Sequence, residues 1–170
     1  MSFKQTYQTI TESEVFKNFI KEHPDAELCT GFFIIDFFSN DNKESLDYKS
    51  GEKIFTFSLR DDKSIKFEED KLMQTEKNPH PSLEKISPHI KADLEDIRAT
   101  AQIQALDNGI NSKFSKIIAV LQKPAKDDKQ IWNLTCMLDG LIILHILIDP
   151  ETGDVIKFER KSMMDMIKRK

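Results

Sequence analysis

Two apolar segments restrict what this chain can fold into more than any other feature. Phe32–Phe38 and Leu141–Ile148 do not alternate between apolar and polar residues, and only Asp36 and His145 interrupt them. A strand whose sheet has one covered face normally alternates. We therefore expect other groups to cover both faces of these strands, because leaving one such apolar side chain exposed to water costs about 1.5–3 kcal/mol of folding free energy. The cover is provided by the other half of the chain, a second copy, a partner protein or a ligand.

The rest of the chain predicts an α+β fold. A capping box at Thr11–Glu14 with an Ile10–Val15 staple predicts a helix that stops at Pro24. The predicted strands are Cys29–Phe38, Ile54–Leu59 and Ser64–Phe67, the last two forming a hairpin, and the polar segment from Ser39 to Gly51 is predicted as a loop or a short edge strand.

A proline-rich segment, Gln74–Pro88, divides the chain. We predict an N-terminal helix-plus-sheet unit over residues 1–75 and a second unit over 76–170. The two units form either separate domains or one merged domain. The second begins with a long helix from Ser87 to Asp107, closed by Gly109 in the left-handed conformation. Its predicted strands are Phe114–Gln122, Gln130–Leu138, Leu141–Asp149 and Val155–Phe158, with Asp139-Gly140 as a two-residue turn, and Arg160–Lys170 is predicted as a short helix.

The two predicted units resemble each other. Ile65–Glu68 and Ile156–Glu159 have the same four residues, and each follows an alternating strand and an acidic turn. Both halves also run from helix to strand to hairpin. Duplication explains this order, and so does the frequency of helix-plus-meander units in α+β proteins; we give the two explanations equal weight.

The second half, about Ser82 to Phe158, resembles a PepSY-type, cystatin-like module. The resemblance rests on the helix followed by an antiparallel meander, on Ile131–Leu134, and on the final Ile148–Ile156 hairpin. This hairpin is similar to the family's ending, a hydrophobic residue followed by Asp-x-x-Thr-Gly-x and a second hydrophobic residue, where x is any residue. It implies a non-catalytic module that binds or restrains another protein, often a peptidase. Modules of this type are typically exported, whereas the N-terminal segment of this sequence lacks the signal-peptide pattern.

Composition and motifs narrow the function. The net charge of −4 disfavours nucleic acid as the main ligand, and the longest apolar run is too short for a transmembrane segment. Neither the four histidines nor Cys29 and Cys136 form a metal-ligand, redox or catalytic motif, so no cofactor is predicted. Whether the two cysteines pair is left open. The cytoplasm is the expected location.

We therefore expect a non-enzymatic binding or regulatory protein that acts through protein contacts, with a homodimer as one form of self-association. The alternative is a small-molecule binding protein or enzyme, with a pocket between the sheet and the long helix. A third interpretation is a C-terminal helix that docks on an acidic partner, although a helix packed on its own sheet is favoured. The candidate pocket or interface residues are Trp132, Cys136, His145, Met163, Met164 and Ile167.

Overall fold

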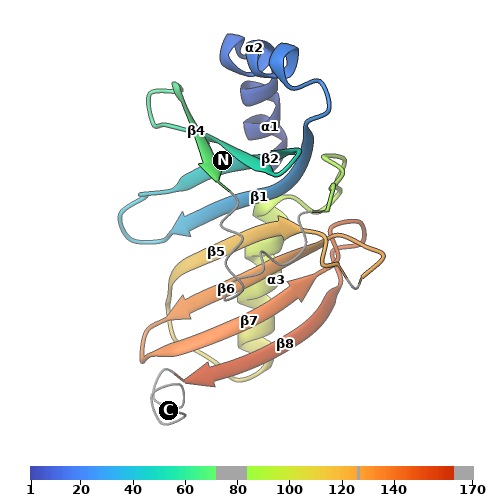
Figure 1. The fold of residues 1–170 in the computed structure, drawn as a ribbon. Coiled ribbons are helices and arrows are strands. Elements are labelled where there is room, and N and C mark those ends of the chain that lie inside the picture. Colours follow the sequence, from blue (N-terminus) through green and yellow to red (C-terminus); the bar gives the residue numbers. More distant parts are fainter. Residues whose placement is uncertain (72–83, 126, 163–170) are drawn as a thin grey trace.

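The protein is an α+β structure in which three helices cover one face of an eight-stranded antiparallel sheet (Figure 1). The computed structural model describes residues 1–71, 84–125 and 127–162. The predicted α+β class is confirmed. The helices are α1 (Phe3–Thr11), α2 (Glu14–Glu22) and α3 (Leu94–Asp107); the strands are β1 (Glu27–Asp36), β2 (Lys43–Ser50), β3 (Lys53–Leu59), β4 (Ile65–Lys71), β5 (Phe114–Gln122), β6 (Ile131–Leu138), β7 (Ile142–Ile148) and β8 (Val155–Ser162).

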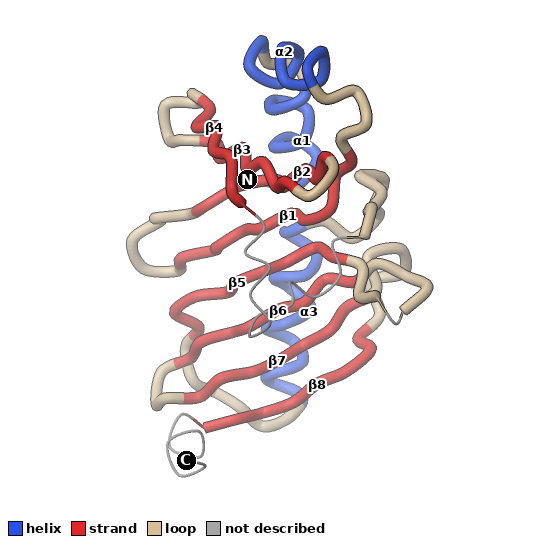
Figure 2. The backbone as a smooth tube through the Cα atoms, viewed as in Figure 1, coloured by secondary structure: helices blue, strands red, loops and turns tan. Residues whose placement is uncertain are grey.

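The strands of both halves join in one sheet with the order β4-β3-β2-β1-β5-β6-β7-β8 (Figure 2). The first half supplies β1–β4 and the second β5–β8, and β1 pairs with β5 in the middle. The two sets of strands therefore meet edge to edge in one sheet, so the other half of the chain does not lie across these strands as a second sheet. The two non-alternating strands, β1 and β7, lie in the same layer, so neither covers the other. The predicted boundary at residue 75 lies outside the described residues.

The N-terminal region contains a helix that the sequence analysis missed. In α1, Phe3 and Ile10 are buried, and Ser2 caps the first turn by accepting a hydrogen bond from the Gln5 amide. Since Thr11 belongs to this helix, Ser13 rather than Thr11 caps α2. With Ser13 as the N-cap, Ile10 and Val15 do not occupy the N′ and N4 positions of a staple, and Val15 is 40% exposed.

The helix α3 begins at Leu94, several residues later than predicted, because Asp93 caps it. Asp93 and Asp96 form a reciprocal capping box. The Asp93 carboxylate also accepts a hydrogen bond from the Phe3 amide at 2.6 Å, so one side chain joins the first turns of α1 and α3. The helix ends as predicted, with Gly109 at φ +74°.

Three further elements differ from the predictions. The segment predicted as a loop or edge strand contains β2, an internal strand between β1 and β3. The hairpin between β6 and β7 has three loop residues instead of two, because Leu138 pairs with Ile142 and Leu141 adopts φ +60°. Arg160–Ser162, predicted as helix, belongs to β8. The remainder of the predicted C-terminal helix, residues 163–170, lies outside the described residues.

One hydrophobic core lies between the helices and the sheet and includes both halves. Phe16 and Phe19 of α2 contact the aromatic side chains of β2 and β3. Phe3 of α1 packs edge-on against Phe33 and Trp132, which come from different halves. The Trp132 indole Nε1 donates to the Ala92 carbonyl at 2.8 Å, so its polar atom is satisfied inside the core.

Candidate binding face of the sheet

The strand pairing divides the side chains of the sheet between two faces. On the covered face, one row across the sheet runs through Phe33, Ala119, Leu134 and Ile146, all of which are buried beneath the helices. The neighbouring residues along each strand point to the opposite side, which we call the open face. Figures 1 and 2 show all three helices on the other side of the sheet. Apolar side chains that the helices do not cover therefore lie on the open face.

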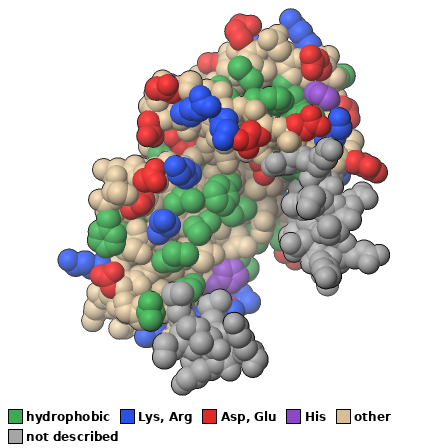
Figure 3. Space-filling view, turned by 60° about the vertical axis from the view of Figure 1, so that its left-hand side comes forward, with side chains coloured by type: hydrophobic (Ala, Val, Ile, Leu, Met, Phe, Trp, Pro, Cys, Tyr) green, Lys and Arg blue, Asp and Glu red, His purple; other side chains and the backbone are tan. Residues whose placement is uncertain are grey.

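Four apolar side chains form a contiguous group in the middle of the open face. Phe32 pairs with Val120, and Ile34 pairs with Ile118, across the β1–β5 junction. We call these four residues the central square. All four are half-buried, whereas their covered-face neighbours Phe33 and Ile117 have no exposed surface. Figure 3 shows hydrophobic side chains gathered near the middle of this face, with charged side chains around them. The helices do not cover the central square, and they also leave uncovered Ile143 and Leu147 of β7, which point to the same face and are half-buried.

The central square combines two predicted strands, but only the β1 segment was expected to be apolar on both faces. Phe32 and Ile34 belong to the first non-alternating segment, but Ile118 and Val120 were not singled out in the sequence. A signal was present, because residues 117–121 read Ile-Ile-Ala-Val-Leu without a polar interruption. Such a run indicates a strand with two apolar faces.

A hydrogen-bonded polar group lies beside the central square on β6, β7 and β8. The Nε2 atom of His145 is 2.8 Å from Asn133 Oδ1, and its Nδ1 atom is 3.8 Å from Glu159 Oε2. The Lys157 and Lys161 ammonium groups also lie 3.8 Å from Glu159 Oε2. His145 thus has a hydrogen-bond partner in Asn133, and its neighbouring carboxylate is shared with two lysines.

The rim of the open face over β5–β8 is mainly basic, although the chain has a net charge of −4. The register places Lys43 and Lys157 in the two rows of the central square, and Lys116 and Lys161 in the next row, which also contains Asp36. Glu159 lies in the row of His145, and on β2 and β4 the same face carries the acids Asp47 and Glu68. An apolar centre with a charged rim is the usual anatomy of a protein interface.

The predicted site residues do not come together. Trp132 and Cys136 are fully buried on the covered face, where the space between sheet and helices is filled by side chains. His145 points to the open face. The three therefore line no common pocket beneath the long helix. Met163, Met164 and Ile167 lie outside the described residues.

The two cysteines are free and buried. Burial raises the pKa of Cys29 and of Cys136 to about 12. Cys136 pairs with Ile117 of β5, which in turn pairs with Ile35 of β1, so Cys136 and Ile35 lie in the same row of the sheet. Ile35 is about six residues, or roughly 20 Å, along β1 from Cys29. Because a disulfide needs Cα atoms within about 7 Å, the two thiols cannot pair within this fold.

Within residues 1–71, 84–125 and 127–162, no group of three or more His, Cys, Asp or Glu side chains is arranged to hold a metal ion. None of the helices in this part of the chain combines the length and apolar character needed to span a membrane. The open face therefore consists of a central apolar group, a hydrogen-bonded polar group and a basic rim, which together form a surface for contact with another molecule.

Comparison with known proteins identifies the fold alone. No protein-family profile matches the chain, and a search of curated protein sequences returned no match. Among solved structures, the chain is similar to the crystal structure of a protein described as a candidate lipoprotein from Clostridium difficile 630. The TM-score is 0.60 at 15% sequence identity, and the match covers 87% of this chain and 91% of the other.

Proposed function

We propose that this chain is a non-enzymatic binding protein that holds a protein partner on the open face of its sheet. The central square is the observation that supports the proposal. It lies in the middle of the sheet, it is half-buried in the isolated chain, and the covered face forms a complete core without it. A partner that buries it gains roughly 25 cal/mol for each Å² of apolar surface removed from water.

We further propose that the sheet consists of two related four-stranded units, of the cystatin-like, PepSY-like kind that the second half resembles. Two helices precede the strands of the first unit, and one precedes those of the second. Two observations support this relation. The strand order is mirrored about the β1–β5 pair, and Ile65–Glu68 and Ile156–Glu159 both lie in the edge strands, β4 and β8. In this arrangement each unit contributes half of the central square. A binding surface made by both units would be absent from either unit alone.

The partner we favour is a different protein with acidic groups around an apolar centre. The basic rim supports this choice, because two copies of the chain facing each other would bring lysines together. A second copy remains the alternative occupant, and the oligomeric state distinguishes it. We retain the cytoplasm as the proposed location.

The test replaces Ile118 and Val120 together by threonine, which keeps β-branched side chains in β5 but removes apolar contact area. Partner capture is measured by pull-down from native lysate, with quantitative binding of the protein recovered. We expect the double variant to lose at least ~90% of capture while its melting temperature changes little.

The matched control is Ile103→Gln, which removes a 56% exposed apolar side chain from the outer surface of α3. The control should capture the partner as the wild type does. Equal capture by the double variant and the wild type contradicts the proposal. If light scattering shows a dimer that the double variant dissociates, the occupant is a second copy instead.

A further inference from the structure

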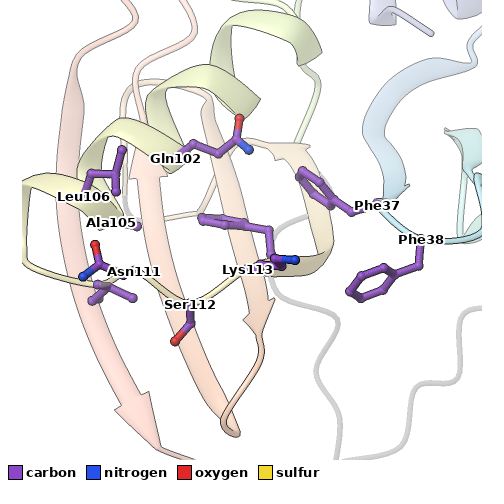
Figure 4. Close-up of a pocket in the computed structure, with 10 residues that line it drawn as sticks. Phe37, Phe38, Gln102, Ala105, Leu106, Asn111, Ser112 and Lys113 are labelled. Atoms are coloured by element: carbon purple, nitrogen blue, oxygen red, sulfur yellow. The ribbon is translucent and has the colours of Figure 1, made fainter.

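A groove at the end of α3 forms a second candidate site, separate from the open face. It has a volume of about 420 Å³ and lies between the β1–β2 loop, the last turns of α3 and the segment before β5. Figure 4 shows Phe37 and Phe38 on one side, Ala105 and Leu106 on the other, and Lys113 between them. The volume is within the usual range for small-molecule sites, about 300–1,000 Å³.

The aromatic wall of the groove is fixed by its own loop. Asp36 Oδ1 accepts hydrogen bonds from the Phe38 and Ser39 amides at 2.9 and 3.0 Å. These bonds hold the pKa of Asp36 down at about 2. Phe37 packs against Phe114, and the Arg98 guanidinium lies 4.4 Å from the Phe37 ring centre. The backbone of Phe38 is thus held in place, and its side chain is 67% exposed beside the groove.

The helical wall is also apolar. Ala105 and Ile110 are buried, and Leu106 is 63% exposed toward solvent. The Ala105 carbonyl accepts from the Ile110 amide, and the Leu106 carbonyl accepts from the Gly109 amide. Because these backbone acceptors are already used, the helix end presents apolar side chains to the groove instead of open carbonyl groups.

A single cation among the lining residues sets the charge of the groove. Lys113 is exposed, and the structure gives it no ion pair with any described residue. Gln102, Asn111 and Ser112 supply amide and hydroxyl groups near it, and no carboxylate lines the groove. A ligand with an apolar body and one anionic group would therefore meet complementary chemistry on all sides.

We propose that this groove binds a small amphipathic carboxylate, with its apolar tail against Phe38 and Leu106 and its carboxylate beside Lys113. The proposal concerns a free small molecule and is independent of the protein partner on the open face.

The test uses decanoate as the probe and decanol as the uncharged probe of the same chain length. Titration calorimetry measures affinity for the full chain, and amide chemical shifts locate the bound probe. We expect decanoate to bind more tightly than decanol and to shift the amides of residues 37–38 and 105–114. The Lys113→Gln variant should weaken decanoate binding roughly five-fold and leave decanol binding unchanged. The Phe38→Ser variant should weaken both probes by roughly ten-fold or more.

The control is Lys53→Gln, in which an exposed lysine of β3 is replaced away from the groove. It should bind both probes as the wild type does. The melting temperature of each variant shows that the fold is retained, since Lys113 and Phe38 are both exposed. The proposal is overturned if decanoate does not bind, if decanol binds as tightly, or if the Lys113→Gln variant binds decanoate with unchanged affinity.

Discussion

The covered and open faces of the sheet are built from the same strands, yet they have different roles. Along β5, Ile117 is fully buried beneath the helices, whereas its neighbour Ile118 on the opposite face is half-buried. The covered face is a continuous aromatic and aliphatic core, whereas the open face combines the central square, a hydrogen-bonded polar group and a basic rim. The comparison teaches that the helices bury the apolar side chains of the covered face, whereas those of the central square stay half-buried and form the surface that we propose for binding.

The largest expected effect comes from the covered face. Replacing Trp132 by alanine removes its packing against Phe3 and Phe33 and its hydrogen bond to Ala92. We expect the free energy of unfolding to fall by about 3–5 kcal/mol, measured by urea denaturation. On the open face, His145→Ala should cost only about 1 kcal/mol, because one half-exposed hydrogen bond is lost. Similar losses for the two variants would remove the distinction between the faces.

A second test compares neighbours in one strand. Ile117→Thr buries a hydroxyl group in the core and loses apolar contacts, so we expect a loss of roughly 2–4 kcal/mol. Ile118→Thr makes the same chemical change on the open face and should cost less than about 1 kcal/mol. Urea denaturation of both single variants gives the difference directly. A loss at Ile118 as large as that at Ile117 would mean that the central square is part of the core.

A third test examines how the helix layer is held over the covered face. Asp93→Ala removes the carboxylate that accepts the Leu94 and Phe3 amides, so α1 and α3 both lose a capping partner. We expect a loss of roughly 2 kcal/mol by thermal or urea denaturation. Asp93→Asn keeps an oxygen acceptor and should lose less. If alanine and asparagine give the wild-type stability, Asp93 does not join the two helices.

The fourth test is a pH dependence that belongs to the covered face. Burial raises the pKa of Cys136 from 9.0 to about 12 in the folded chain. Above pH ~9 the unfolded chain loses this proton while the folded chain keeps it, so the stability contribution is complete below that pH and is lost as pH rises toward 12. We expect a slope of up to ~1.4 kcal/mol per pH unit from this thiol. Stability measured from pH 8 to 10.5 should therefore fall less steeply in Cys136→Ala, and identical slopes would contradict the burial of the thiol.

The sequence predicted the elements whose side chains follow a clear local pattern. The β3–β4 hairpin and the end of α3 at Gly109 were read correctly, because strand alternation and a left-handed glycine are local signals. The first helix was missed although Phe3, Tyr7 and Ile10 have helical spacing, since its N-terminus carries only Ser2 as a cap signal. The start of α3 was placed too early because Ser87-Pro88 has the form of a helix start. Asp93 and Asp96 form the actual capping box without the usual Ser or Thr.

The candidate sites depended more strongly on contacts between distant residues. Trp132, Cys136 and His145 were grouped by sequence, but alternation along the strands places His145 on the opposite face from the other two. The central square forms only when β1 pairs with β5, a contact between residues more than 80 positions apart. The groove similarly needs the β1–β2 loop and the end of α3 to meet.

The amino-acid sequence by itself determined that two strands carry apolar side chains on both faces, because their residues do not alternate between apolar and polar. It also determined the α+β class and the order of most elements. Only the tertiary structure decided where the surplus lies. The pairing of β1 with β5 places Phe32 and Ile34 beside Ile118 and Val120. The three helices pack on the opposite face of the sheet and leave these four side chains uncovered. Local sequence patterns do not encode which strand edges pair, since that choice depends on the free energy of the whole core.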